Sequence, residues 1–335
     1  MQVDSLDTPV MNQAIEEIDE FLVVERTFSP DAERPSVGLA NMHSVVGDIE
    51  LNKDKIVRAI KVFKERHANI VIFPEFCMSG YFWEDEAACR AYMDQAVIDE
   101  HTDWVEREIR PLLDDDLRAV VLNALSRGEN DRYFNKTMVI GVDNDYRSSK
   151  SSYLKVFLPG IEKLYTDTGK DNRLVLGSPF GRVGFTTCYD YLFTELLRKY
   201  SFEDEVDVIV EVASWRAFAT RDYAAMNIRS DYYYGQLWDM VMSASSAMNQ
   251  VWTVACNAVG RHEISGIAFW GGSGVWAPSG MNLIQASHFN EELIIVHNLD
   301  LKGQRKVETD DFSYAFDFSE VYHAILGQRK HSYVE

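Results

Sequence analysis

The sequence predicts a single α/β domain whose sheets are covered by helices. Apolar strand-like runs alternate with amphipathic helical patterns through most of the 335 residues, which is typical of folds that pack helices on the faces of sheets. No low-complexity linker and no repeat of fixed period divides the chain. Its length and its 46 % content of hydrophobic residues allow a sizeable buried core.

Residues 1–35 are predicted to form an extension that precedes this domain. Between Gln13 and Arg26, apolar residues recur at a spacing that favours a helix. Two X-Pro pairs then interrupt the pattern, at Ser29-Pro30 and Arg34-Pro35. We therefore expect a helix over residues 13–26 and a break before residue 36.

The first half of the domain alternates strands with helices. Residues 51–67 carry Ile56, Ile60 and Phe63 on one face and predict an amphipathic helix. Residues 69–73 are almost continuously apolar, as in a strand that is buried on both faces. The remaining elements expected here are strands over residues 36–46, 118–125, 137–142 and 152–158, and a helix over residues 104–113.

The second half continues the alternation. A strand over residues 181–187 is expected to end at Cys188, and residues 266–279 are rich in glycine. Residues 303–335 are acidic and aromatic and are expected to be irregular. The other predicted elements are helices over residues 192–200 and 231–248, and strands over residues 206–212, 251–256 and 293–301.

Charge and cysteine usage restrict the class of protein. Lys and Arg number 33 against 53 Asp and Glu, a net charge of −20, which argues against nucleic acid or an anionic membrane as a partner. The sequence has no apolar run of about 18 residues and no secretory signal pattern at its start. The four cysteines, Cys77, Cys89, Cys188 and Cys256, form no Cys-x-x-Cys pair. We therefore expect free thiols, a cytoplasmic location, and neither a metal nor an organic cofactor.

Three reactive side chains lie at or near the ends of strand-like runs. Glu75 ends Ile-Val-Ile-Phe-Pro-Glu, Lys155 lies in Tyr-Leu-Lys-Val-Phe-Leu-Pro, and Cys188 ends Gly-Phe-Thr-Thr-Cys. Brought together, they would supply a base, an ammonium that stabilises negative charge, and a nucleophile. That set suits attack on a carbonyl or nitrile carbon attached to nitrogen.

Each of these residues also has a plain structural interpretation. A cysteine is more often a small buried hydrophobic residue than a nucleophile. Lys155 could extend along a sheet edge with its ammonium in water, and Glu75 could lie in a surface loop. Glu162, seven residues after Lys155, could be the partner of that lysine or a second acid.

Several ordered motifs together resemble the nitrilase superfamily of carbon–nitrogen hydrolases, from about Ser36 to about Ser287. The motifs that carry the resemblance are Phe73-Pro-Glu75 with Ser79-Gly-Tyr81, Tyr133-Phe-Asn135, Tyr153-Leu-Lys155-Val-Phe-Leu-Pro159, Gly184-Phe-Thr-Thr-Cys188-Tyr-Asp-Tyr-Leu-Phe-Thr-Glu195, Ala255-Cys-Asn257-Ala-Val-Gly260 and Gly271-Gly-Ser273 through Gly280.

The resemblance implies an αββα sandwich over residues 36–302 that forms a homodimer or a larger homo-oligomer, with residues 303–335 at the dimer interface. It implies that Glu75 is the general base, that Lys155 stabilises the tetrahedral intermediate, and that Cys188 is the nucleophile. Glu162 would be the family's second glutamate, which positions groups at the site. The backbone N–H of Tyr189 would donate to the oxyanion.

The residues around the cysteine favour some substrates over others. Cys188-Tyr-Asp is similar to the amidase and carbamoylase branches, whereas the nitrile-cleaving branch usually has Cys-Trp-Glu. Tyr191 and Leu192 stand where one carbamoylase branch has carboxylate-binding arginines. Arg216 could bind a carboxylate from another loop or be a structural arginine. Tyr81, Trp215 and Trp270 could line the pocket or be core aromatic residues.

The leading hypothesis is a cysteine-dependent hydrolase that cleaves a small linear amide through a thioester and releases ammonia or an amine. The alternative is an N-carbamoyl amine hydrolase, which also releases carbon dioxide; nitrile hydrolysis and acyl transfer to an amine are less favoured. Two other classes remain open, a non-catalytic scaffold and a Cys-His hydrolase that uses His262, His288 or His297.

Overall fold

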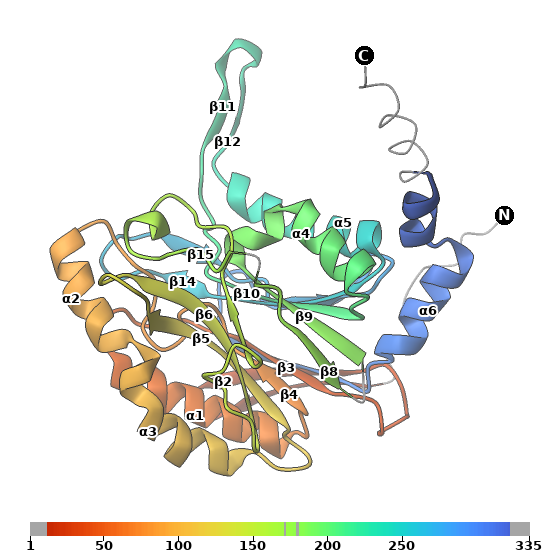
Figure 1. The fold of residues 1–335 in the computed structure, drawn as a ribbon, viewed down its shortest axis with the longest axis horizontal. Coiled ribbons are helices and arrows are strands. Elements are labelled where there is room, and N and C mark those ends of the chain that lie inside the picture. The colour runs from red at the N-terminus through yellow and green to blue at the C-terminus, as the bar shows by residue number, and fades with distance from the viewer. Residues whose placement is uncertain (1–11, 171, 179–180, 322–335) are drawn as a thin grey trace, which may run out of the picture.

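The computed structural model describes residues 12–170, 172–178 and 181–321. Two sheets pack face to face, and helices cover the outer face of each sheet, which gives four layers in the order αββα (Figure 1). The predicted fold class is therefore confirmed. The predicted division at residues 36 and 302 stays a prediction.

The first sheet has eight strands in the order β1-β2-β18-β3-β4-β5-β6-β7. Strands β3, β4 and β5 run parallel to one another, so their carboxyl ends lie at the same edge of the sheet. The strands are β1 (Asn12–Ile18), β2 (Phe21–Thr27), β3 (Val37–Asn41), β4 (Ile70–Ile72), β5 (Ala119–Arg127), β6 (Tyr133–Gly141), β7 (Ser152–Leu154) and β18 (Glu292–His297).

The second sheet has six strands in the order β17-β16-β13-β10-β9-β8. Its central strands β9, β10 and β13 are parallel. The strands are β8 (Val175–Ser178), β9 (Gly181–Thr187), β10 (Val208–Ala213), β13 (Trp252–Asn257), β16 (Gly274–Trp276) and β17 (Asn282–Gln285). A separate pair, β14 (Val259–Arg261) and β15 (Ala268–Trp270), lies outside both sheets.

Helices cover the two outer faces. Helix α1 (Ile49–Glu65), helix α2 (Glu86–Ala96) and the helical run from α3 (Thr102–Trp104) to Leu112 belong to the side of the eight-stranded sheet, and α4 (Thr194–Arg198) and α5 (Tyr233–Asn249) cover the other sheet (Figure 1). Helix α1 begins where the Asp48 side chain accepts a hydrogen bond from the Leu51 N–H, an N-cap that satisfies one of the otherwise free donors of the first turn.

The core between the sheets is made of alternating side chains. Val37 and Leu39 of β3 face the six-stranded sheet, where they meet Val208, Val210 and Val212 of β10. On β3, Ala40 points the other way, into the core beneath α1. Because neighbouring residues on a strand point to opposite faces, β3 contributes to two cores at once.

The predicted helix over residues 13–26 is wrong. This segment forms the hairpin β1–β2, which turns at Asp19 with a positive φ of 55°, and β2 pairs in parallel with β18 at the edge of the sheet. Phe21 and Val23 are buried, which is the alternation of a half-buried strand. Pairing with β18 and burial of this face outweigh the helical spacing of the apolar residues.

The C-terminal segment also differs from its prediction. Helix α6 (Leu301–Asp311) and a further helical stretch over residues 314–321 replace the irregular structure expected from residue 303. The Asp300 carboxylate accepts from the Gly303 N–H and caps α6, so a cap and a charged helix surface compensate for the weak apolar pattern. The part of the expectation on residues 322–335 lies outside the described residues.

One hairpin stands away from the sandwich. Strands β11 (Arg221–Tyr223) and β12 (Ile228–Ser230) pair only with each other and project from the end that carries α5 (Figure 1). The hairpin begins five residues after Arg216, so it is continuous with a residue expected at the site. Among the described residues, no helix is long and apolar enough to cross a membrane.

Candidate active site

The candidate catalytic residues all follow strands. Glu75 lies three residues after β4, Lys155 directly after β7, and Cys188 directly after β9. Strand β7 ends at Leu154, so the predicted strand over residues 152–158 is too long, and Lys155 begins the loop that also carries Glu162. Two sheets therefore contribute to one site.

Lys155 lies between two carboxylates. Its Nζ donates to Glu75 Oε1 at 2.8 Å and to Glu162 Oε1 at 2.5 Å. All three side chains are fully buried, with an exposed fraction of 0 % for Lys155 and for both of its partners. A buried charge is costly unless it is paired and hydrogen-bonded, and each oxygen of the two carboxylates has at least one donor.

Asn135 completes this network, although the sequence reasoning did not assign it to the site. Its side-chain amide donates to Glu75 Oε1 at 2.7 Å and to Glu162 Oε2 at 3.1 Å, while its own Oδ1 accepts from Asn123 at 2.7 Å. The signal available in the sequence was a pair of amides, Asn123 and Asn135, within two predominantly buried strands that also carry apolar runs.

Each carboxylate also has one further donor. The Ser214 N–H, just after β10, donates to Glu75 Oε2 at 2.9 Å. The Tyr81 hydroxyl donates to Glu162 Oε1 at 2.6 Å. Tyr81, predicted as a pocket residue, is therefore a direct partner of Glu162.

Cys188 lies on a sharp turn from β9 into a short 3₁₀ helix (Cys188–Leu192). Its φ of 54° is in the left-handed region, which is uncommon for a residue other than glycine and marks a constrained position. Asp190 fixes the turn, since its carboxylate accepts from the Thr187 N–H at 3.1 Å and from the Tyr153 hydroxyl at 2.7 Å.

The charges of the buried groups follow from their mutual positions. Burial alone would lower the pKa of Lys155, but the carboxylates of Glu162 and Glu75 outweigh it and hold this pKa well above its ordinary value. Burial raises the pKa of Glu75, while the ammonium of Lys155 opposes that rise and the Glu162 carboxylate adds to it. Lys155 therefore stays charged, and Glu75 is a stronger base than an ordinary glutamate.

Cys188 rests as a thiol. Burial raises its pKa well above the ordinary value and the Glu75 carboxylate adds to this, whereas Lys155 works in the opposite direction. Burial, with the Glu162 and Glu75 carboxylates, also raises the pKa of Tyr81, so this phenol remains a hydrogen-bond donor. Loss of the thiol proton is therefore unfavourable while the Glu75 carboxylate is charged.

A pocket of about 330 Å³ opens over Cys188. Cys188, which is 9 % exposed, contributes to its wall. Glu75, Lys155 and Glu162 are fully buried and do not line it, but Ser214 and Tyr81 of the wall hydrogen-bond to the two carboxylates. The residues that line the pocket are Tyr81, Glu84, Pro159, Gly160, Ile161, Cys188, Tyr189, Leu192, Ser214, Trp215, Arg216 and Tyr234. Four predicted pocket residues, Tyr81, Tyr189, Trp215 and Arg216, are among them.

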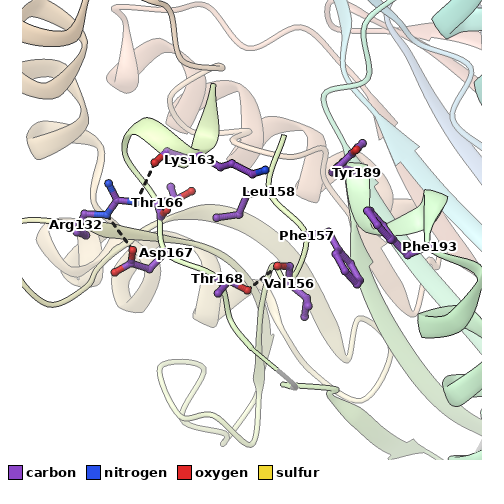
Figure 2. A pocket seen from close by; sticks show the side chains of 10 residues that line it. All are labelled: Arg132, Val156, Phe157, Leu158, Lys163, Thr166, Asp167, Thr168, Tyr189 and Phe193. Atoms are coloured by element: carbon purple, nitrogen blue, oxygen red, sulfur yellow. Dashed lines mark hydrogen bonds and ion pairs between the residues drawn. The ribbon is translucent and has the colours of Figure 1, made fainter. Parts of the chain in front are cut away.

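A second hollow, of about 510 Å³, adjoins the first. Figure 2 shows its wall, in which Arg132 pairs with Asp167 and the Thr168 hydroxyl donates to the Val156 carbonyl. The two hollows share Tyr189. The second one is lined by neither Cys188 nor the three buried charged groups, so the smaller pocket is the candidate active site.

Other sequence candidates lie elsewhere. Trp270 stacks on His288 with ring centroids 4.2 Å apart and does not line the pocket. His262 is buried against the Tyr81 carbonyl, at 2.8 Å, and His297 pairs with Glu25. None of these histidines lines this pocket. Over residues 12–170, 172–178 and 181–321, no group of three or more His, Cys, Asp and Glu side chains could hold a metal ion.

The chain belongs to the carbon–nitrogen hydrolase family, which it matches over residues 36–307. It is a hydrolase of the nitrilase superfamily that acts on carbon–nitrogen bonds. It is 25 % identical to a nitrilase from Pyrococcus abyssi over 84 % of this chain and 95 % of that protein. It is 22 % identical to a chloroplastic omega-amidase from Arabidopsis thaliana (81 % and 69 % covered) and to an N-carbamoylputrescine amidase from Solanum tuberosum (76 % and 82 % covered).

Solved structures share the fold. A carbon–nitrogen hydrolase superfamily protein from Xanthomonas campestris superposes with a TM-score of 0.68 at 19 % identity, over 85 % of this chain and 97 % of that one. An amidase from Nesterenkonia gives 0.63 at 19 % identity, with 84 % and 98 % covered. A glutamine-dependent NAD⁺ synthetase from Acinetobacter baumannii gives 0.62 at 21 % identity over 78 % of this chain, which spans only 44 % of that larger protein.

Proposed function

We propose that this protein is a cysteine-dependent amidohydrolase that cleaves a non-peptide carbon–nitrogen bond of a small linear amide through a thioester, releasing ammonia or an amine. The observation that carries the proposal is the Lys155 ammonium held between the Glu75 and Glu162 carboxylates, directly behind a pocket that Cys188 lines. A nucleophile, a base and a cation then face one bound carbonyl group.

The first half of the reaction forms the thioester. Glu75 takes the thiol proton as the sulfur of Cys188 attacks the amide carbon, and the carbonyl oxygen becomes an oxyanion. The Lys155 ammonium, with the Tyr189 N–H, stabilises that oxyanion; one such donor typically contributes about 3 kcal/mol. Glu75 returns the proton to the departing nitrogen, and the carbon–nitrogen bond breaks.

The second half regenerates the enzyme. A water molecule gives a proton to Glu75 and attacks the thioester, and Lys155 again stabilises the oxyanion. The carbon–sulfur bond breaks, the carboxylic acid leaves, and Cys188 regains its proton from Glu75. Glu162 acts throughout as a positioning residue, because it fixes Lys155 from the side opposite Glu75 and is itself held by Tyr81.

The alternative is hydrolysis of an N-carbamoyl amine. The similarity to an N-carbamoylputrescine amidase favours it, and the same three residues would attack the ureido carbon. Hydrolysis would then yield an amine, carbon dioxide and ammonia, so carbon dioxide separates this reaction from that of an amidase.

We also propose that the C-terminal segment packs between two copies of the chain in a homodimer or a larger homo-oligomer. Phe312 and Phe316 in this segment are 68 % and 63 % exposed, and clustered exposed aromatic residues are typical of interfaces. Light scattering after size-exclusion chromatography tests this; a monomer at micromolar concentration would contradict it.

The function is tested by ammonia and carbon dioxide release from aliphatic amides, ω-amides and N-carbamoyl amines. We expect ammonia without carbon dioxide from the wild type, and none from Cys188→Ala. Cys256→Ala, which removes another buried thiol at the sheet interface, is the matched control and retains turnover if folded. Release of ammonia that survives Cys188→Ala would contradict the proposal.

A further inference from the structure

The pocket over Cys188 carries one acidic and one basic side chain. Among its lining residues, Glu84 and Arg216 are the two with formal charge. Glu84 is exposed and Arg216 half-buried. Across the described residues, neither side chain takes part in an ion pair or side-chain hydrogen bond, so both charges are open to a ligand.

The two charges come from different segments of the chain. Glu84 lies three residues after Tyr81, whose hydroxyl holds Glu162. Arg216 lies two residues after Ser214, whose N–H holds Glu75. Both segments are thus anchored on the buried carboxylates. They bring Glu84 and Arg216 to the pocket whose wall includes Cys188.

The geometry points to a substrate that is a zwitterion: an α-amino acid whose side chain ends in the amide group to be cleaved, with its ammonium at Glu84 and its carboxylate at Arg216. This rests on the proposed amidase function and specifies its substrate class. The aromatic walls, Tyr189, Trp215 and Tyr234, would enclose the intervening carbon chain.

Charge arithmetic favours a zwitterion over a singly charged substrate. Behind the wall, two carboxylates and one ammonium leave a net charge of −1 next to Cys188 when all three are ionised, and the whole chain has a net charge of −20. A substrate with only a carboxylate would be repelled by Glu84 and by this background. One with only an ammonium would leave Arg216 without a partner. A zwitterion pairs both charges and adds no net charge.

Four matched amides test the inference on the wild-type protein: L-glutamine with both charges, glutaramic acid with the carboxylate only, γ-aminobutyramide with the ammonium only, and butyramide with neither. We expect kcat/KM for L-glutamine to exceed that for butyramide by about 100-fold, since each charge pair contributes about tenfold. L-citrulline is a zwitterion that carries a ureido group instead of an amide. Its cleavage releases carbon dioxide, so it separates N-carbamoyl amine hydrolysis from amide hydrolysis.

Two substitutions assign the charges. Glu84→Gln is expected to lower kcat/KM about tenfold for the two amides that carry an ammonium, relative to butyramide. Arg216→Gln is expected to do so for the two that carry a carboxylate. Glu108→Gln and Arg107→Gln, which neutralise exposed charges outside the pocket, are matched controls and leave these ratios unchanged.

The outcomes separate the two proposals. If butyramide is cleaved in a reaction that requires Cys188 but L-glutamine and L-citrulline are no better, the zwitterion inference is wrong and the amidase function stands. If no amide or ureido compound is cleaved, both fail. Calorimetry on folded Cys188→Ala gives a second readout, in which L-glutamine binds and butyramide does not; equal binding of the two overturns the inference.

Discussion

The carboxylate of Asp190 accepts a hydrogen bond from the backbone N–H of Phe157 at 2.7 Å. This contact joins the turn that carries Cys188 to the loop that begins at Lys155. Because β7 and β9 belong to different sheets, Asp190 fixes the Cys188 turn relative to the Lys155 loop across the sandwich. Burial raises the pKa of Asp190 to about 7, although Lys155 and the three donors at this carboxylate favour its charged form.

Asp190→Asn is expected to lower both stability and turnover. An amide nitrogen would meet one of the N–H donors that now face a carboxylate oxygen, and an unsatisfied buried donor costs about 1–3 kcal/mol. Urea denaturation measures the first effect and kcat the second. Asp85→Asn, at the exposed cap of α2, is the control. If turnover fell as much in Asp85→Asn as in Asp190→Asn, the positioning role of Asp190 would be contradicted.

Asn135→Ala is expected to change the pH dependence of the reaction. The Asn135 hydrogen bond lowers the pKa of Glu75, so its loss raises that pKa, and Glu75 then becomes an ionised base only at higher pH. Because a hydrogen bond to a charged group stabilises that charge, the acid limb of kcat/KM should move to higher pH when the Asn135 amide is removed.

The matched control for Asn135 is Asn249→Ala, which removes a buried amide at the end of α5. It should reduce stability and leave the acid limb where it is in the wild type. An unchanged limb in folded Asn135→Ala would show that Glu75 is not the base that the profile reports.

Lys155→Met tests the central ammonium. Its removal leaves two buried carboxylates without their shared cation, and breaking a buried ion pair costs about 3–5 kcal/mol. Loss of an oxyanion donor should also lower kcat by about 10²–10³-fold. Lys136→Met is the comparison, because Lys136 is also buried but donates to the Arg147 carbonyl. Equal losses of kcat in the two folded variants would contradict the assigned role.

Cys188 should be the thiol that iodoacetamide modifies in the native protein. It is 9 % exposed in a pocket, whereas Cys77, Cys89 and Cys256 are at most 1 % exposed. The rate should rise with pH, because burial and Glu75 raise the pKa of this thiol and the thiolate is the nucleophile. Peptide mapping identifies the site; modification of another cysteine at a similar rate would contradict this expectation.

The sequence predicted the elements that form the sandwich better than those at its edges. Strand β10 is apolar almost throughout because both of its faces are covered, and such a run is readable without tertiary information. The hairpin β1–β2 could not be read in this way, because its strand character depends on pairing with β18, more than 260 residues along the chain. The spacing of apolar residues within the hairpin itself does not indicate that β18 is its pairing partner.

The candidate site shows the same division. The sequence singles out Glu75, Lys155 and Cys188 as candidates, because each lies at or near the end of an apolar run and within one of several ordered motifs. Asn135 was missed as a site residue, since an amide within a strand has no distinctive spacing, and its importance depends on two carboxylates that meet only in the fold. The position of Glu84 in the pocket wall could not be predicted either, because Glu84 lies in a loop whose placement depends on the rest of the fold.

The division of the site between two sheets makes enzymatic activity a probe of folding. Glu75 and Lys155 follow strands of the eight-stranded sheet, and Cys188 follows a strand of the six-stranded sheet. A chain in which only one of the sheets has formed therefore lacks at least one of these three residues at the candidate site. During refolding from denaturant, circular dichroism would register each sheet as it forms. Turnover would return only in the kinetic phase in which the two sheets dock, and would time that event directly.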